Sequence, residues 1–276
     1  MSLLTINAGS SSLKVALYDD EAASRTAAIA VEQIGGPETL VRIADSNRST
    51  TRNVELHDHA AAVDEVFNRL PELFASTIRA IGHRLVHGGP DHHDPEPITP
   101  TLLDALRKLE QIDRTHTPQA LGIIEAVTRR FPGVPQFACY DTAFHRSMPD
   151  VAQRYPLPRW TLNAGVRRYG FHGLSCESII AQLEKISATA SRVLIAHLGN
   201  GASVTAVRDA VSVDTTMGFS PTGGLMMGTR CGDLDPTVVT FLMQLLNDIR
   251  RRGKAGERER GAACSFGTKS EYARFA

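Results

Sequence analysis

The sequence predicts an α/β protein built from two units that begin in the same way. Residues 3–18 contain two apolar runs on either side of a Gly/Ser turn. Residues 192–217 repeat this plan, with a strand, a Gly-Asn-Gly turn and a further hairpin. Elsewhere, segments whose apolar residues recur at helical spacing alternate with short buried strands, which is typical of an α/β fold.

The first unit is expected over residues 1–148. Its opening hairpin is followed by β-like runs over residues 25–36 and 39–45, so the unit begins with antiparallel strands. Segments with apolar residues at helical spacing then alternate with short apolar runs. The helical spacing predicts helices over 59–70, 101–112 and 118–131, and the short runs predict buried strands over 78–86 and 134–142.

The second unit is expected over residues 149–246, after a proline-rich passage that reads as a linker. It should contain a helix over 172–186, then the strand and hairpin described above. Residues 247–276 are charged, rich in glycine and without apolar periodicity. A segment of this composition buries too little apolar surface to order itself, so we expect a disordered tail.

Composition excludes several functional classes. The chain has 276 residues, enough for two domains, and its 30 basic and 30 acidic residues give no indication of nucleic acid or an anionic membrane as a partner. No run approaches the roughly 20 apolar residues that span a bilayer. Four scattered cysteines lack metal-ligand spacing, which favours a reducing cytoplasm and small, buried apolar roles for Cys139, Cys176, Cys231 and Cys264.

Two glycine turns are candidate phosphate sites. In the stretch NAGSSSLK, backbone N–H groups and hydroxyls can approach an anion, Lys14 adds a positive charge, and Asn7 offers an oxygen to a hard cation. The stretch lacks the GK[ST] ending of a P-loop, and an ordinary hairpin turn is the alternative. The same alternative holds for the second turn, Gly199 to Gly201.

Arg84 and Asp141 are charged residues in or beside stretches that are expected to be buried. Arg84 falls inside an apolar strand, and a guanidinium that stays charged requires an anionic partner there, either a structural carboxylate or a substrate. Asp141 follows a buried strand, at the edge where open α/β sheets bind ligands. The alternative for Asp141 is a helix or turn cap.

Two further residues complete a set that suits phosphoryl transfer. His172 lies in the stretch GFHG, where a structural role is the alternative to a functional one. Arg230 ends a long glycine-rich segment of the kind that forms binding loops, and it is a candidate for stabilising a transferring phosphate. Two glycine turns, an Asn and an Asp for Mg²⁺, two arginines and a histidine are the groups that phosphoryl transfer uses.

These stretches resemble the acetate kinase family. INAGSSSLK, GHRLVHGG, YDTAFH, RRYGFHG, AHLGNGAS and DTTMGFSP…GLMMGTRCGDLDP occur in order between residues 3 and 236. The resemblance implies a duplicated ribonuclease-H-like fold of the actin, hexokinase and Hsp70 type, with the active site in the cleft between two domains. It also implies reversible in-line transfer between ATP and acetate, with Mg²⁺, by a homodimer.

The resemblance also assigns roles to positions of this chain. Asn7 resembles the Mg²⁺-site residue. The catalytic positions are Asp141, His172 and Arg230; the ATP contacts are Lys14, His197, Leu198, Gly199, Asn200 and Gly201; and the substrate-binding positions are Arg84, Val86, His116, Phe171 and Pro221. Because acetate is already ionised at neutral pH, we expect Asp141 to orient Mg²⁺ or an arginine rather than to act as a general base.

Some stretches depart from the family pattern. Thr115 precedes His116 where the family has an apolar residue, so we expect an altered preference among acyl groups. After about Leu246 the resemblance stops, and neither the adenosine-binding segment nor the late glutamate for Mg²⁺ is seen. The second domain is therefore expected to be incomplete. An inactive relative that binds phosphate or acyl ligands is the alternative to an active kinase.

Overall fold

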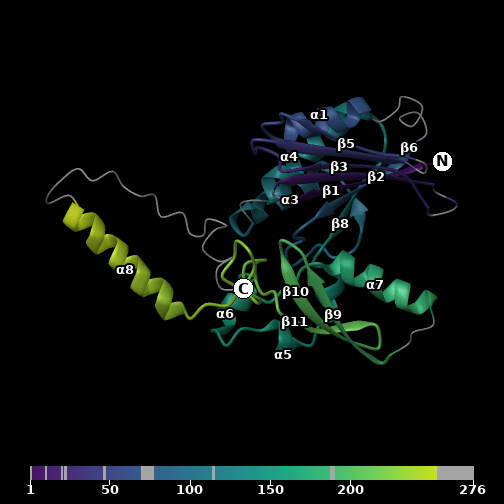
Figure 1. The fold of residues 1–276 in the computed structure, drawn as a ribbon. Helices are drawn as coiled ribbons and strands as arrows, with labels where there is room; N and C mark the ends of the chain where they lie inside the picture. Colours follow the sequence, from purple (N-terminus) through teal and green to yellow (C-terminus); the bar gives the residue numbers. More distant parts are fainter. Residues whose placement is uncertain are drawn as a thin grey trace. The chain divides into compact units, whose positions relative to one another are not determined.

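The computed structural model describes residues 2–9, 11–19, 21, 24–45, 48–69, 78–113, 116–186 and 190–253, with side chains up to residue 247. The expectations for Thr115 and for residues 254–276 therefore lie outside the described residues. The chain forms two compact units (Figure 1). Unit 1 holds the residues up to Arg146 together with Phe171–Ser178, and unit 2 holds Ser147–Gly170 and the chain from Ile179 onwards.

Unit 1 contains a sheet with the strand order β5-β4-β3-β2-β1-β6-β8-β7. Strands β1 to β5 are antiparallel neighbours, whereas β6 runs parallel to both β1 and β8. The strands are β1 (Ser2–Gly9), β2 (Ser12–Asp19), β3 (Arg25–Glu32), β4 (Thr39–Asp45), β5 (Ser49–Val54), β6 (Ile78–Leu85), β7 (Glu96–Pro97) and β8 (Gln136–Tyr140). The opening hairpin and the predicted strands are confirmed, and β5 is an additional, mostly exposed strand.

The helices of unit 1 are those that the apolar spacing predicts. They are α1 (His59–Arg69), α3 (Pro100–Lys108) and α4 (His116–Arg130), with short 3-10 turns at Leu109–Gln111 and Ala143–Ser147. Helix α3 begins where Thr99 accepts a hydrogen bond from the Leu102 backbone N–H at 3.2 Å. Pro100 follows at the first helical position, where its missing N–H leaves no bond unmade.

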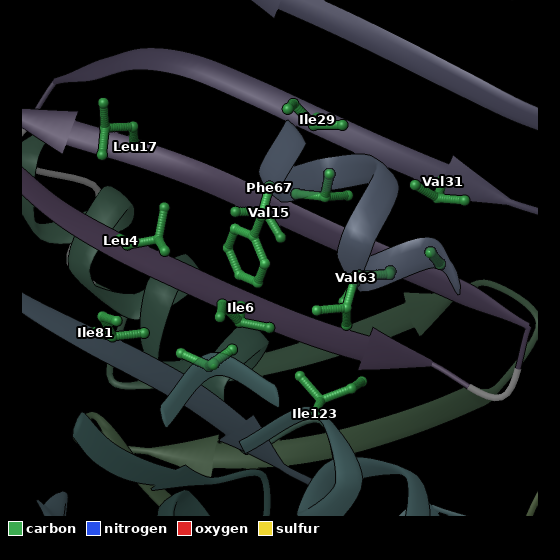
Figure 2. Close-up of a cluster of buried hydrophobic side chains, with 14 of the residues drawn as sticks. Leu4, Ile6, Val15, Leu17, Ile29, Val31, Val63, Phe67, Ile81 and Ile123 are labelled. Atoms are coloured by element: carbon green, nitrogen blue, oxygen red, sulfur yellow. The ribbon is translucent and has the colours of Figure 1, made fainter. Parts of the chain in front are cut away.

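The main core of unit 1 lies between one face of the sheet and α1 and α4. Side chains of β1 and β2 alternate, so Leu4, Ile6 and Val15 point to the face that Val63 and Phe67 of α1 cover (Figure 2). The opposite face of the same strands carries exposed polar side chains. This alternation leaves polar groups at the strand ends free to form a site.

Unit 2 contains an antiparallel sheet with the order β11-β10-β9. Its strands are β9 (Arg192–Leu198), β10 (Ala202–Arg208) and β11 (Val211–Thr215), as the repeated plan predicts. Helix α7 (Gly173–Lys185) begins in the residues of unit 1 and continues into unit 2. Within the described residues, no helix combines the length and the apolar character needed to cross a bilayer.

The passage predicted as a linker contains two short helices, α5 (Asp150–Gln153) and α6 (Arg159–Asn163). Pro149 and Pro158 cap them, because proline is tolerated at a helix start as well as in a turn. The expectation of a disordered tail over residues 247–276 is wrong for residues 247–253, because α8 (Pro236–Gly253) extends through them. Once a helix has formed, each added residue gains a backbone bond at little cost.

The cysteines fit the sequence prediction only in part. Cys139, Cys176 and Cys231 are free thiols, and Cys176 is buried as expected. Cys139 is half-buried and Cys231 is exposed, because Cys231 lies in the glycine-rich loop rather than in an element with a core face. Cys264 lies outside the described residues.

Candidate active site

The centre of the candidate site is Arg84, on a row of polar residues that crosses the sheet of unit 1. Strand pairing places Lys14 opposite Asn7 and Asn7 opposite Arg84, so the three residues follow one another across β2, β1 and β6. Directly opposed residues on neighbouring strands share a face. Arg84 Nη1 donates to Asn7 Oδ1 at 2.9 Å, which joins two motifs that are 77 residues apart in sequence.

Asp141 supplies the anion that Arg84 requires. It follows β8, and its carboxylate Oδ2 forms an ion pair with Arg84 Nη2. The Asp141 side chain is 3% exposed, whereas that of Arg84 is 24% exposed. The two contacts use two of the five N–H donors of the guanidinium, so the partly exposed cation can still bind an anionic ligand.

The backbone around Asp141 is held on both sides. Its N–H donates to the Leu85 carbonyl at 2.8 Å, and its carbonyl accepts from the Gly173 N–H at 2.7 Å. A Cβ on Gly173 would lie 2.3 Å from that carbonyl oxygen, so only glycine permits this approach. The stretch GFHG is thereby fixed against the end of β8.

His172 has an unusual backbone conformation for its residue type. Its φ is 61°, in the left-handed region, and Gly170, two residues earlier, has a φ of 72°. Such a conformation costs a non-glycine residue about 1–3 kcal/mol and is concentrated at functional sites. The neighbouring Phe171 is buried, with its ring edge-on to His87 at 5.6 Å between ring centroids.

His145, in the stretch YDTAFH, contacts this loop and is a site residue to which the sequence assigns no role. Its Nε2–H donates to the Phe171 carbonyl at 2.9 Å. Burial lowers the pKa of His145, and the hydrogen bond to Phe171 and the charge of Asp141 oppose this shift without cancelling it. His145 is therefore a neutral donor at pH 7 that holds the chain beside His172.

A small pocket lies next to this group of residues in unit 1. Val86, His87 and His116 line it, with Leu85, Leu106, Thr117, Ala120 and Leu121. Its free volume is about 10 Å³, close to what one water molecule needs. The structure thus brings Val86 and His116 to one pocket.

Asp113 is a site residue that sequence analysis missed. Its Oδ1 accepts from His116 Nδ1 at 2.9 Å and from the His116 backbone N–H at 3.1 Å, at the start of α4. Burial alone raises the pKa of Asp113, but the hydrogen bonds and charge of His116 outweigh it, so the pKa is lowered. The available signal in the sequence was an Asp shortly before a helical run, a residue type that caps helix N-termini.

Unit 2 holds the remaining predicted residues in two places. His197 and Leu198 end β9, and the turn from Gly199 to Gly201 is closed by the Gly199 N–H donating to the Gly201 carbonyl at 3.1 Å. Arg230 Nη1 donates to the Pro221 carbonyl at 2.9 Å, so these two predicted residues also come together.

Hydrogen bonds within the glycine-rich loop of unit 2 fix its conformation. The Gly224 N–H donates to the Asp233 carboxylate at 2.6 Å, and the Asp233 N–H donates back to the Gly224 carbonyl at 2.9 Å. Gly224 has a φ of 86°, and a Cβ there would meet the Thr216 carbonyl oxygen at 2.4 Å. The glycines therefore serve close backbone contacts that hold Arg230 in place.

Comparison with known proteins agrees with these motifs. The model of the acetokinase family matches residues 2–250. Acetate kinases of Rhodopseudomonas palustris and Deinococcus radiodurans are each 41% identical to this chain, over 88% and 87% of it. The alignments cover 63% and 61% of those relatives, so the chain spans less than two thirds of their length.

Solved structures give the same result for the fold. The crystal structure of Porphyromonas gingivalis acetate kinase matches with a TM-score of 0.75 and 35% identity, over 89% of this chain and 64% of that one. A propionate kinase from Francisella tularensis matches with a TM-score of 0.81 and 33% identity, over 89% and 65%. The duplicated α/β fold predicted from the sequence is thus the fold of these kinases, and the chain belongs to the acetokinase family.

Proposed function

We propose that this chain transfers the γ-phosphoryl group of ATP to acetate or a similar short-chain carboxylate, reversibly, giving an acyl phosphate and ADP. The observation that carries the proposal is Arg84, a partly exposed cation held between Asn7 and Asp141 at the strand ends of unit 1. Membership of the acetokinase family supports the reaction class.

The chemistry suits a site that positions charges. A carboxylate oxygen of acetate attacks the γ-phosphorus in line. The new O–P bond forms as the bond from the γ-phosphorus to the bridging oxygen breaks, and ADP leaves with that electron pair. Acetate carries no proton at neutral pH that must be removed, so catalysis depends on alignment and on cations that neutralise charge.

In this reaction Arg84 binds the anionic carboxylate or the phosphoryl oxygens. Asp141 orients the guanidinium, which agrees with their ion pair and with the burial of Asp141. Asp141 therefore acts through Arg84 and is not needed as a general base. His172 and Arg230 are proposed to stabilise the charge of the transferring group, as donors set in place before the reaction.

The proposed acyl subsite is the small pocket of unit 1 that Leu85 and Val86 line, directly after Arg84 in the sequence. It is lined by Val86 and His116, and its free volume of about 10 Å³ suits a methyl group better than a longer chain. Phe171 and Pro221 are proposed as further substrate contacts on the basis of the motifs. The propionate kinase among the solved relatives shows that the family is not restricted to acetate.

The nucleotide is proposed to be bound by the two glycine turns, through Lys14 in unit 1 and His197 to Gly201 in unit 2. Exposed backbone N–H groups in such turns suit phosphates. In unit 1 Lys14 lies opposite Asn7, in the same row as Arg84, which supports a phosphate near these three residues.

Mg²⁺ is proposed as part of the nucleotide complex. Within the described part of the chain, no group of three or more His, Cys, Asp or Glu side chains could hold a metal ion. Asn7 and Asp141 offer oxygens beside Arg84, a donor set that fits an ion shared with phosphates and water rather than an all-protein site. When bound, the ion would neutralise phosphate charge.

The proposed assembly rests on the family resemblance, and the proposed location rests on the free cysteines. We propose a homodimer in the cytoplasm, where ATP is available and free thiols such as Cys231 stay reduced. Light scattering coupled to size exclusion measures the oligomeric state directly.

The test is acyl-hydroxamate formation by the purified chain with ATP, Mg²⁺ and acetate, run beside a thermal melt. We expect product, and we expect Arg230→Ala to lower kcat by about 10²–10³ while changing the KM for acetate much less. Arg208→Ala, an exposed arginine on β10 of the same unit, is the control and should retain activity. A cooperative melt without product would instead support a relative that only binds its ligands.

A further inference from the structure

The two units share an opening of three antiparallel strands, β1-β2-β3 and β9-β10-β11. In unit 1, Leu4 pairs with Leu17 and Ile6 pairs with Val15 across the first hairpin. In unit 2 the corresponding pairs are Leu194 with Ala206 and Ala196 with Val204. Aligning Gly9 with Gly199, at the two turns, places Leu4 on Leu194, Ile6 on Ala196 and Ala8 on Leu198.

The equivalent faces differ in burial. In unit 1 this face is buried, and Val63 and Phe67 of α1 pack against it (Figure 2). In unit 2, Leu194 is 76% exposed and Leu198 is 77% exposed. We call the face formed by Leu194, Ala196, Leu198, Val204 and Ala206 the open face.

The other face of the unit 2 sheet is already covered. Ile195 and Val207 point to it and are buried. Val193, on the same face, lines a pocket with Ile180 and Leu183 of α7. The open face is therefore the side of this sheet that still needs a layer.

Helix α8 has the stripe that such a layer requires. Val238, Phe241, Leu242 and Leu245 recur at positions i, i+3, i+4 and i+7, which lie on one side of a helix. Phe241 is 62% exposed and Leu245 is also exposed. In each unit this is the first helix after the antiparallel strands, since α1 follows β5 and α8 follows β11.

We propose that α8 packs its apolar stripe on the open face, as α1 does on the equivalent face of unit 1. The dimensions agree, because an 18-residue helix is about 27 Å long and the seven residues of β9 extend about 23 Å. The chain just before α8 also lies beside the open face. Asp233, three residues before Pro236, lines one pocket with Leu194, Val204 and Ala206 of the open face.

Disulfide trapping tests which chain covers the face. Each variant carries two new cysteines, one at Leu194 or Leu198 of the open face and one at Phe241, Leu242 or Leu245 of the stripe. Cys231 and Cys264 are removed from all variants. The matched controls combine the same strand positions with Thr240 or Gln244, on the other side of α8. The proposal predicts disulfides within one chain for the stripe pairs, identified by mass spectrometry of the linked peptides, and few for the controls.

Other trapping results would overturn the proposal. Disulfides mainly between two chains would show that a second copy covers the open face. Equal trapping of stripe and control pairs, or none at all, would show that α8 does not pack there. None of these results depends on whether the chain transfers phosphate, because each concerns unit 2 alone.

Hydrogen exchange gives a second, independent readout. Leu194→Asp should lower the protection of α8 amides roughly tenfold or more, because it places a charge in the proposed contact. The amides of β10 and β11 in unit 2 should keep their protection, as should those of β1 and β6 in unit 1, which shows that both units still fold in the variant. Leu157→Asp, at an exposed leucine outside the sheet, is the matched control and should leave α8 unchanged. Unchanged α8 exchange in Leu194→Asp would contradict the proposal.

Discussion

Replacing Asp141 by Asn separates the charge of this residue from its shape. The carboxylate is 3% exposed and pairs with Arg84, whose side chain is 24% exposed. A hydrogen bond to a charged group contributes about 1.5–3 kcal/mol and a neutral one about 0.5–1.5 kcal/mol. Since Asn keeps a carbonyl oxygen, we expect the free energy of unfolding to fall by about 1–2 kcal/mol. Solvent at the guanidinium keeps this below the roughly 3–5 kcal/mol of a fully buried pair.

The effect on catalysis should be larger than the effect on stability. Without the Asp141 charge, the guanidinium of Arg84 loses the group that orients it, and we expect kcat/KM for acetate to fall by about 10²-fold, within the range for a lost charge-stabilising donor. Urea unfolding and acyl-hydroxamate kinetics on the same preparation measure both quantities.

Asp94→Asn is the matched control for this experiment. Asp94 pairs with Arg146 at 3.3 Å, but its side chain is 78% exposed, and such surface pairs contribute only about 0–1 kcal/mol. The reasoning is refuted if Asp141→Asn loses no more stability and no more activity than Asp94→Asn.

Three further predictions follow from the geometry. Gly173→Ala should destabilise the fold by at least about 1–3 kcal/mol in urea unfolding, because its Cβ would lie 2.3 Å from the Asp141 carbonyl oxygen. Gly82→Ala is the control and should be tolerated, since a Cβ there would have nothing within 4 Å. Equal destabilisation by the two substitutions would count against the close contact at Gly173. Burial lowers the pKa of His83 from its usual 6.5 to about 4. Between pH 6.5 and 4 the unfolded chain is therefore protonated at His83 while the folded chain is not, so the free energy of unfolding falls as the pH falls through this range. Wild type should lose about 2 kcal/mol more than His83→Gln between pH 7 and 5, and parallel losses would contradict this cause. Val86→Ala should raise kcat/KM for propionate relative to acetate by about tenfold, and an unchanged ratio would argue against the proposed acyl pocket.

Much of the fold of unit 1 could be predicted because its signals are local. The alternation of Leu4, Ile6 and Val15 identifies strands, and the spacing of Val63 and Phe67 identifies a helix. Strand β5 was missed because its residues are mostly exposed and show no alternation of apolar and polar side chains. The helical start of the predicted tail was missed because a helix already begun can extend into polar sequence.

The candidate site was predictable as a list of residues but not as a set of contacts. Nothing near Arg84 in the sequence shows that its partner is Asp141, because that pairing arises only when β6 lies beside β8. For the same reason the choice between a structural carboxylate and a substrate stayed open until the fold was known. Asp113 and His145 act through single contacts to His116 and Phe171, which no spacing rule predicts.

The proposed reaction is tested most directly by ³¹P NMR of the purified chain with ATP, Mg²⁺ and acetate labelled with ¹⁸O in both carboxylate oxygens. Direct attack of the carboxylate on the γ-phosphorus predicts ADP and acetyl phosphate in equal amounts, with the ¹⁸O isotope shift on the phosphorus signal from the labelled bridging oxygen. ADP with unlabelled inorganic phosphate alone, or ATP that remains unchanged, would contradict the proposal.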